Sequence, residues 1–179
     1  MNKYFKTALF LALPLAFLLG CSKQSSTTSS SSSTPETTEV KTSEFSTTEK
    51  KPELKTATFV NDSQPGVVST LTYTVDGDNV VKQTAHNVAN PEVLNSTADA
   101  VKSVLEETYK GYKGLKGVTF SIEVKDGKVV QDLEIDLSVA SIDELRKALP
   151  EEYSGVGKNV SFKASKKMLT EHGYKEQTN

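Results

Sequence analysis

The chain has 179 residues, enough for one domain of ordinary size with a tail. It carries 21 basic and 23 acidic side chains, a net charge of −2, which argues against the basic excess of a nucleic-acid-binding domain. A single cysteine excludes an internal disulfide, a cysteine-rich zinc site and an iron–sulfur cluster, and with only two histidines in the chain we expect no cofactor.

The first twenty residues have the pattern of an export signal. Lys3 and Lys6 precede an apolar run from Thr7 to Leu19. This run is short for a permanent membrane span, which needs about 20 residues, and suits the apolar region of a signal peptide, which has about 7–15. We predict that residues 1–20 are a cleaved signal peptide.

The only cysteine of the chain follows this run directly. The segment Leu18-Leu19-Gly20-Cys21 resembles the bacterial lipobox, in which a peptidase cuts after a small residue and the next cysteine is acylated. The resemblance implies cleavage between Gly20 and Cys21, and lipidation of Cys21 with chains such as palmitate. The partner is then the lipid bilayer, reached from the extracytoplasmic face of the cell membrane. The alternative is an ordinary secretory signal that happens to end near a cysteine.

Serine and threonine dominate the residues after Cys21. They account for 18 of the 34 residues in 22–55, where the only sizeable apolar side chains are Val40, Phe45 and Leu54. Such a composition cannot offset the entropy of ordering the chain, so we predict a disordered tether over 21–55. Its function is that of a spacer; the alternative is low-complexity sequence without a selected length.

From Thr56 the pattern changes to that of a compact α+β domain, predicted over 56–179. Apolar and polar residues alternate around a tight turn at 76–79, which indicates a hairpin. A helix opens at Ser96 or Thr97, because apolar residues from Val101 to Tyr112 recur at helical spacing. The predicted strands in this part are 58–60, 68–75 and 80–88.

The second half of the domain repeats this order. After three glycines, a second hairpin is predicted with its turn at 125–128 and strands at 118–124 and 129–137. Ser141 and Glu144 form a capping box for a short helix that Pro150 ends. A last strand is expected at 160–162, followed by a last helix that Ser165 begins and Gly173 ends.

The two hairpins are similar at an offset of 49 residues. Five apolar positions of the first fall on apolar positions of the second: Leu71, Tyr73, Val75, Val80 and Val81 match Phe120, Ile122, Val124, Val129 and Val130. The predicted fold is therefore an antiparallel sheet built from two similar β-hairpins, with about three helices packed on one face.

Three segments carry a family resemblance. Residues 71–84, 109–118 and 158–176 closely resemble the YehR-like family of small bacterial lipoproteins, in the same order. The shared motifs are turns and helix ends, and the family is one of unknown function, so the resemblance implies a fold and no catalytic residues. The long serine- and threonine-rich spacer fits a Gram-positive host.

Acidic residues on one predicted strand offer candidate chemistry. Asp132, Glu134 and Asp136 lie two apart, so their side chains share one face of the strand, and paired carboxylates can act as acid and base. Because they alternate with Leu133 and Ile135, a solvated face is the expected structural role. A small envelope enzyme that uses these carboxylates is the alternative.

Other polar motifs have structural interpretations. His86 and His172 lack further ligands at metal spacing, and the segment from Asp76 to Asn79 is too short for a calcium loop, so no metal site is expected. Lys110, Lys113 and Lys116 alternate with glycines; they indicate a helix end, or alternatively a surface for an anionic polymer.

The sequence thus predicts a membrane-anchored extracytoplasmic lipoprotein without enzyme activity. Its domain is expected to be a binding or envelope-interaction module, with an envelope polymer or protein as partner and no nucleic acid. A further alternative function is a short pheromone released from the signal peptide, since residues 13–20 form an apolar octapeptide.

Overall fold

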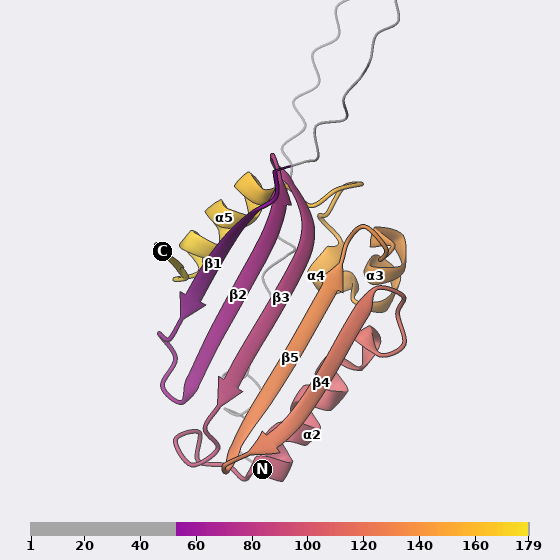
Figure 1. The fold of residues 1–179 in the computed structure, drawn as a ribbon. Helices are drawn as coiled ribbons and strands as arrows, with labels where there is room; N and C mark the ends of the chain where they lie inside the picture. Colours follow the sequence, from indigo (N-terminus) through magenta and orange to yellow (C-terminus); the bar gives the residue numbers. More distant parts are fainter. Residues whose placement is uncertain (1–52, 179) are drawn as a thin grey trace, which may run out of the picture.

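The computed structural model describes residues 53–178, which form one six-stranded antiparallel sheet with its helices on one face (Figure 1). The strand order is β4-β5-β3-β2-β1-β6. The strands are β1 (Lys55–Asn61), β2 (Val67–Asp76), β3 (Asn79–Ala89), β4 (Val118–Lys125), β5 (Lys128–Asp136) and β6 (Lys175–Gln177). The helices are α2 (Ala98–Thr108), the 3-10 helix η1 (Lys110–Tyr112), α3 (Ile142–Ala148), α4 (Pro150–Tyr153) and α5 (Phe162–Glu171). The predicted α+β fold is confirmed.

On the covered face, α5 lies toward one edge of the sheet and α2 toward the other edge (Figure 1). Strand β3 lies between the strands that these two helices cover. On one side, Phe162 of α5 packs against Phe59 and Tyr73 of β1 and β2, with ring centroids 6.3 and 6.2 Å apart. On the other side, α2 packs on β4 and β5. No helix within residues 53–178 is long and apolar enough to cross a membrane.

The two hairpins differ by one residue. In β4–β5 the pairing is regular, whereas in β2–β3 Val75 pairs with Val80 and Thr74 pairs with Lys82, so that Val81 is an extra residue. This is a β-bulge, and the carbonyl of Val81 accepts a hydrogen bond from the backbone N–H of Leu137 at 2.9 Å. Because side chains alternate between faces, the bulge reverses the face of every later residue of β3.

The C-terminal part departs from prediction. Residues 160–162 are not a strand; an isolated bridge joins Ser161 to Asn79, and Phe162 already begins α5. Ser161 and not Ser165 caps this helix, since its Oγ accepts from the N–H of Ala164 at 3.2 Å. The physical reason is Asp78 of the first turn, whose carbonyl accepts from the N–H of Phe162 at 2.7 Å and fixes the helix start.

Most predicted helix ends are confirmed. Thr97 caps α2 and Ser141 caps α3, each through its hydroxyl oxygen. Gly173 has a φ of +84° after α5, and the N–H of Tyr174 returns to the carbonyl of Leu169 at 2.9 Å. Pro150 follows α3 as predicted, but it also begins α4, which the sequence analysis did not predict.

Two strands were predicted incompletely. Strand β1 begins at Lys55 rather than Thr58, and β6 was not predicted at all. Strand β6 has only three residues, Lys175–Gln177, all exposed, and pairs with β1 along its outer edge. It carries no apolar residue, so its sequence gives no strand pattern.

Candidate functional site

The predicted anchor lies outside the described residues. Gly20, Cys21, the signal peptide 1–20 and the tether up to Pro52 are therefore not placed, and the cleavage and lipidation of Cys21 stay predictions. The functional candidates that the structure does place all belong to the domain.

The three carboxylates of β5 lie on the open face of the sheet, as predicted. Glu134 Oε1 lies 2.8 Å from the Nζ of Lys82, its diagonal neighbour on β3. Asp136 accepts hydrogen bonds from the N–H and hydroxyl of Ser138, at 2.9 and 2.5 Å. These bonds hold the pKa of Asp136 below its usual value, so this group is a poor proton donor near neutral pH. The arrangement is that of a solvated, charge-paired surface.

His86 takes part in a row that sequence reasoning did not find. Its Nδ1 lies 2.7 Å from Oδ1 of Asp132, and the strand register places Thr70 on the other side of His86. Hydroxyl, imidazole and carboxylate in a line are the components of a proton relay. Here, however, the His86 and Asp132 side chains are about half exposed, at 55% and 49%, on a flat face that does not exclude water.

His172 lies on the helical side of the sheet, apart from His86. It ends α5, and its Nδ1 bonds with the carbonyl oxygen of Met168 at 2.8 Å. The structure therefore does not bring the two histidines together. Within residues 53–178 no three metal-ligating side chains form a group that could hold an ion.

The turn from Asp76 to Asn79 contacts the N-terminus of α5 through Asp78. The carboxylate of Asp78 accepts from the Ser161 hydroxyl at 2.8 Å and from the N–H of Lys163 at 2.7 Å. These bonds lower the pKa of Asp78, as expected for a carboxylate at a helix N-terminus. Asp78 thus fastens the first hairpin to α5.

Lys110, Lys113 and Lys116 follow the end of α2, as the structural interpretation expected. Lys110 pairs with Glu107 at 2.5 Å, and all three lysine side chains are exposed. Nearby Gly111 is required by packing, because a Cβ there would lie 2.6 Å from the carbonyl oxygen of Ala148. The glycine at position 111 therefore has a structural cause in the contact between η1 and α3.

A buried cluster of phenols and one carboxyl lies between η1 and α4. The hydroxyl of Tyr112 donates to Glu152 at 2.6 Å and lies 3.2 Å from the hydroxyl of Tyr153. Burial raises the pKa of Glu152 to about 7, although the bond from Tyr112 opposes this rise and the charge of Glu151 adds to it. Glu152 therefore titrates close to physiological pH.

The strongest candidate site is a strip of buried polar side chains on the inner face of the sheet. We call it the polar strip, and its members are Ser69 of β2, Gln83 and Asn87 of β3, and Gln131 of β5. All four are at most 7% exposed, at positions where a core strand normally carries apolar side chains.

Hydrogen bonds connect three members of the polar strip in one direction. The hydroxyl of Tyr174 donates to Ser69 at 2.9 Å, and Ser69 donates to Oδ1 of Asn87. Asn87 Nδ2 then donates to Oε1 of Gln131 at 3.2 Å. The Nε2 atoms of Gln131 and Gln83 end without a hydrogen-bond partner within residues 53–178.

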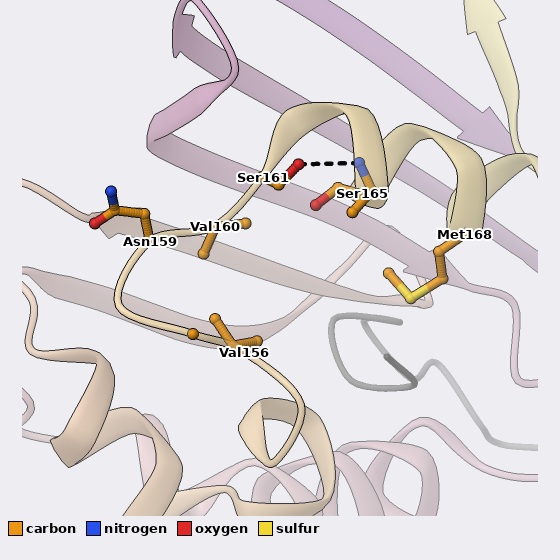
Figure 2. Close-up of a pocket in the computed structure, with 8 residues that line it drawn as sticks. Val156, Asn159, Val160, Ser161, Ser165 and Met168 are labelled. Carbon is orange, nitrogen blue, oxygen red and sulfur yellow. Dashed lines mark hydrogen bonds between the residues drawn. The ribbon is translucent and has the colours of Figure 1, made fainter. Parts of the chain in front are cut away.

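A small cavity lies between α5 and the loop that precedes it (Figure 2). Its volume is about 60 Å³, and Val156, Val160 and Met168 give it a mainly apolar wall. Ser165 also lines it and hydrogen-bonds with Tyr73, which is the cross-strand neighbour of Gln83. Tyr73 thus connects Ser165, in the cavity wall, with Gln83 of the polar strip. Sequence reasoning predicted neither.

Comparisons with known proteins agree with this fold. Residues 55–175 match the model of a family described as a protein of unknown function, DUF1307. An uncharacterised lipoprotein of Listeria innocua is 39% identical over 106 residues, which cover 58% of this chain and 69% of that protein. An uncharacterised lipoprotein of Listeria monocytogenes is 40% identical over 107 residues, with the same coverage.

A solved structure supports the same conclusion. The NMR structure of the Escherichia coli YehR protein matches with a TM-score of 0.55 at 20% identity, covering 70% of this chain and 91% of that one. At this identity the match concerns the fold. Together with the family match, it confirms the resemblance on which the sequence analysis relied.

Proposed function

Because the chain belongs to the DUF1307 family, and its relatives in Listeria are lipoproteins, we propose that it is an extracytoplasmic lipoprotein held in the cell membrane by an acylated Cys21. We propose further that its domain binds an envelope ligand without transforming it. The observation that carries the anchor is the position of the only cysteine, directly after a short apolar run and a glycine.

The buried polar strip supports a binding role. It offers oriented hydrogen-bond donors on a rigid sheet, which is the usual arrangement of a binding site with few polar groups in an apolar surround. The open face supports the enzyme alternative less well. Its carboxylates are paired with Lys82, His86 and Ser138, and no wall shields them from water.

The anchor is tested by mass and partition. The native protein is compared with Cys21→Ala and with Ser22→Ala, a matched control one residue away. We expect the native chain and Ser22→Ala to begin at Cys21, carry acyl mass and enter the detergent phase. Cys21→Ala should remain uncleaved or be released. A native protein without acyl mass would overturn the proposed anchor, and Cys21 would then be a free thiol.

The non-enzymatic role has its own test. If an envelope-hydrolysing activity is found in the purified protein, the amide variants Glu134→Gln and Asp136→Asn are assayed beside it. Loss of that activity in either variant would overturn the proposal and favour the enzyme. Absence of turnover, together with a saturable ligand complex, is the expected result.

A further inference from the structure

Strand β3, between β5 and β2, has a less apolar inner face than either of its neighbours. After the bulge at Val81, the inward residues of β3 are Gln83, Ala85, Asn87 and Ala89. The neighbouring strands present mainly large apolar residues inward, such as Leu71 and Tyr73 on β2. Small and polar residues on the innermost strand leave little to pack on, but they let another chain approach the sheet closely.

The hydrogen bonds of the polar strip end at donors that lack an acceptor within the described residues. Each group in the series Tyr174, Ser69, Asn87 donates to the next, so each bond polarises the one that follows. The series ends at Gln131 Nε2, which is fully buried and has no acceptor within the described residues. The Nε2 atom of Gln83, a residue that is 1% exposed, also has no acceptor within the described residues. Buried amides seldom lack a hydrogen-bond partner, because a buried donor without an acceptor destabilises the folded state.

We propose that the polar strip is a binding site for an extended peptide segment of another molecule, whose backbone carbonyls accept from Gln83 and Gln131. This inference rests on the proposed binding role and gives that role a ligand class. A peptide backbone is uncharged and supplies acceptors at regular intervals, which matches a site whose free groups are uncharged donors.

The spacing of the two amides determines the size of the ligand. Gln131 pairs with Asn87, which lies four residues after Gln83 on β3. At about 3.3 Å per residue, the two amides are roughly 13 Å apart along the strand. One sugar or one amino acid cannot span this distance. In an extended peptide, carbonyls four residues apart point to the same side at the same spacing.

The proposed segment would lie beneath the helical layer, because both amides are on the covered face of the sheet. Helix α5 packs on β1 and β2 and α2 packs on β4 and β5, so the two helices cover the strands on either side of β3 (Figure 1). Because both amides are buried, entry of the segment requires α5 and α2 to separate. Ser165, which lines a cavity with Met168 (Figure 2), hydrogen-bonds with Tyr73, the cross-strand neighbour of Gln83.

The proposal is tested by titrating the processed chain, residues 21–179 with Cys21→Ala, labelled with ¹⁵N. The probe is the end-capped hexapeptide Ac-Ala-Ser-Ala-Ser-Ala-Ser-NH₂, which is long enough to reach both amides. Ac-Ala-Ser-NH₂ is too short, and chitotriose presents amide carbonyls on a sugar chain. We expect the hexapeptide alone to shift the side-chain amide signals of Gln83 and Gln131, with saturation.

Two variants locate the site. Gln83→Leu and Gln131→Leu should each weaken hexapeptide binding at least tenfold, whereas Gln177→Leu, the same change on exposed β6, should leave it unchanged. Gln83→Leu removes a buried donor without a partner and keeps the volume, so it should fold with an unchanged or higher melting temperature. Weaker binding in this variant is then not a folding defect.

Three results would overturn the proposal. The amide signals could stay unshifted up to millimolar hexapeptide, as they would if water satisfied both groups. The variants in the polar strip could bind as the native chain does. Chitotriose could shift the signals while the hexapeptide does not, which would reject the peptide class but retain the proposed binding role.

Discussion

The two hairpins have similar turns but differ in the pairing of their strands. Both have a tight turn with a glycine at positive φ, Gly77 in the first and Gly127 in the second, and both pair antiparallel. Only the first contains an extra residue, Val81. At the offset of 49, Lys82 and His86 align with Gln131 and Ile135, whose side chains point inward in the second hairpin. The one extra residue therefore determines which alternate residues of the strand face solvent.

The bulge accounts for both polar surfaces of the sheet. It places Lys82 and His86 on the open face, where Lys82 forms an ion pair with Glu134 and His86 lies opposite Asp132, in contact with its carboxylate. It also turns Gln83 inward, where the polar strip forms. A regular strand would bury a lysine and a histidine instead.

Reversing the faces of β3 should have the largest effect. Insertion of one alanine between Lys82 and Gln83 shifts the alternation and directs His86 into the core, or Lys82 if the bulge is lost, which we expect to cost more than about 4 kcal/mol or to prevent folding. Urea denaturation followed by circular dichroism measures this. Val81→Ala keeps the bulge and should stay within about 1 kcal/mol of the native protein. Equal stability of the insertion variant would mean that the alternation of β3 does not set the faces.

The next test concerns the helical layer near the second hairpin, where the half-buried carboxyl of Glu152 accepts from Tyr112, a ring neighbour of Phe120 on β4. Folding keeps Glu152 protonated up to a pKa of about 7, against 4.5 in the unfolded chain. The stability it contributes is complete below pH 4.5 and is lost as pH rises through 7, so the native protein should lose about 2–3 kcal/mol between pH 5 and pH 8.

Glu152→Gln should flatten this dependence, and Glu151→Gln on the exposed side should not. Denaturant midpoints across this pH range provide the measurement. A native protein equally stable at pH 5 and pH 8 would contradict the raised pKa of Glu152.

The turns of the two hairpins offer a matched pair of smaller changes. Asp78→Asn removes the charge that holds the N-terminus of α5 and should lower the melting temperature by roughly 3 °C. Asp126→Asn makes the same change in the second turn, where asparagine also tolerates the positive φ of 50°, and should have no effect. Equal shifts by calorimetry would reject the fastening role of Asp78.

The smallest effect is expected on the open face. Lys82→Ala breaks the pair with Glu134, but both side chains are more than 40% exposed, so the loss should be below about 0.5 kcal/mol. Chemical denaturation with and without added salt measures it. A loss above 2 kcal/mol would show that this ion pair is more than a solvated contact.

The sequence allowed the fold to be predicted where apolar residues alternate strongly. Leu133 and Ile135 made the face of β5 clear, and with it the solvated position of the carboxylates. In β3, all of residues 82–87 except Ala85 are polar. The even-numbered and odd-numbered residues, which point to opposite faces, therefore look alike, and the pattern does not show which of them point inward. The polar strip was missed for this reason, since glutamine and asparagine in a strand normally indicate solvent.

Other errors arose where distant contacts set the structure. Ser165 and Ser161 are equally good caps by residue type, and the choice depends on Asp78, more than eighty residues away. Likewise β6 is a strand only because β1 offers it a free edge. Both contacts join residues far apart in the sequence, so the pattern of neighbouring residues does not predict them.

The pairing of β6 with β1 joins segments near the two ends of the domain. Thr58 pairs with Gln177, and Tyr174 supplies the first donor of the polar strip. A chain made from its N-terminus can complete neither contact until residues 174–177 have been added. The outer edge of β1 and the hydroxyl of Ser69 therefore wait for their partners while the other strands can already pair.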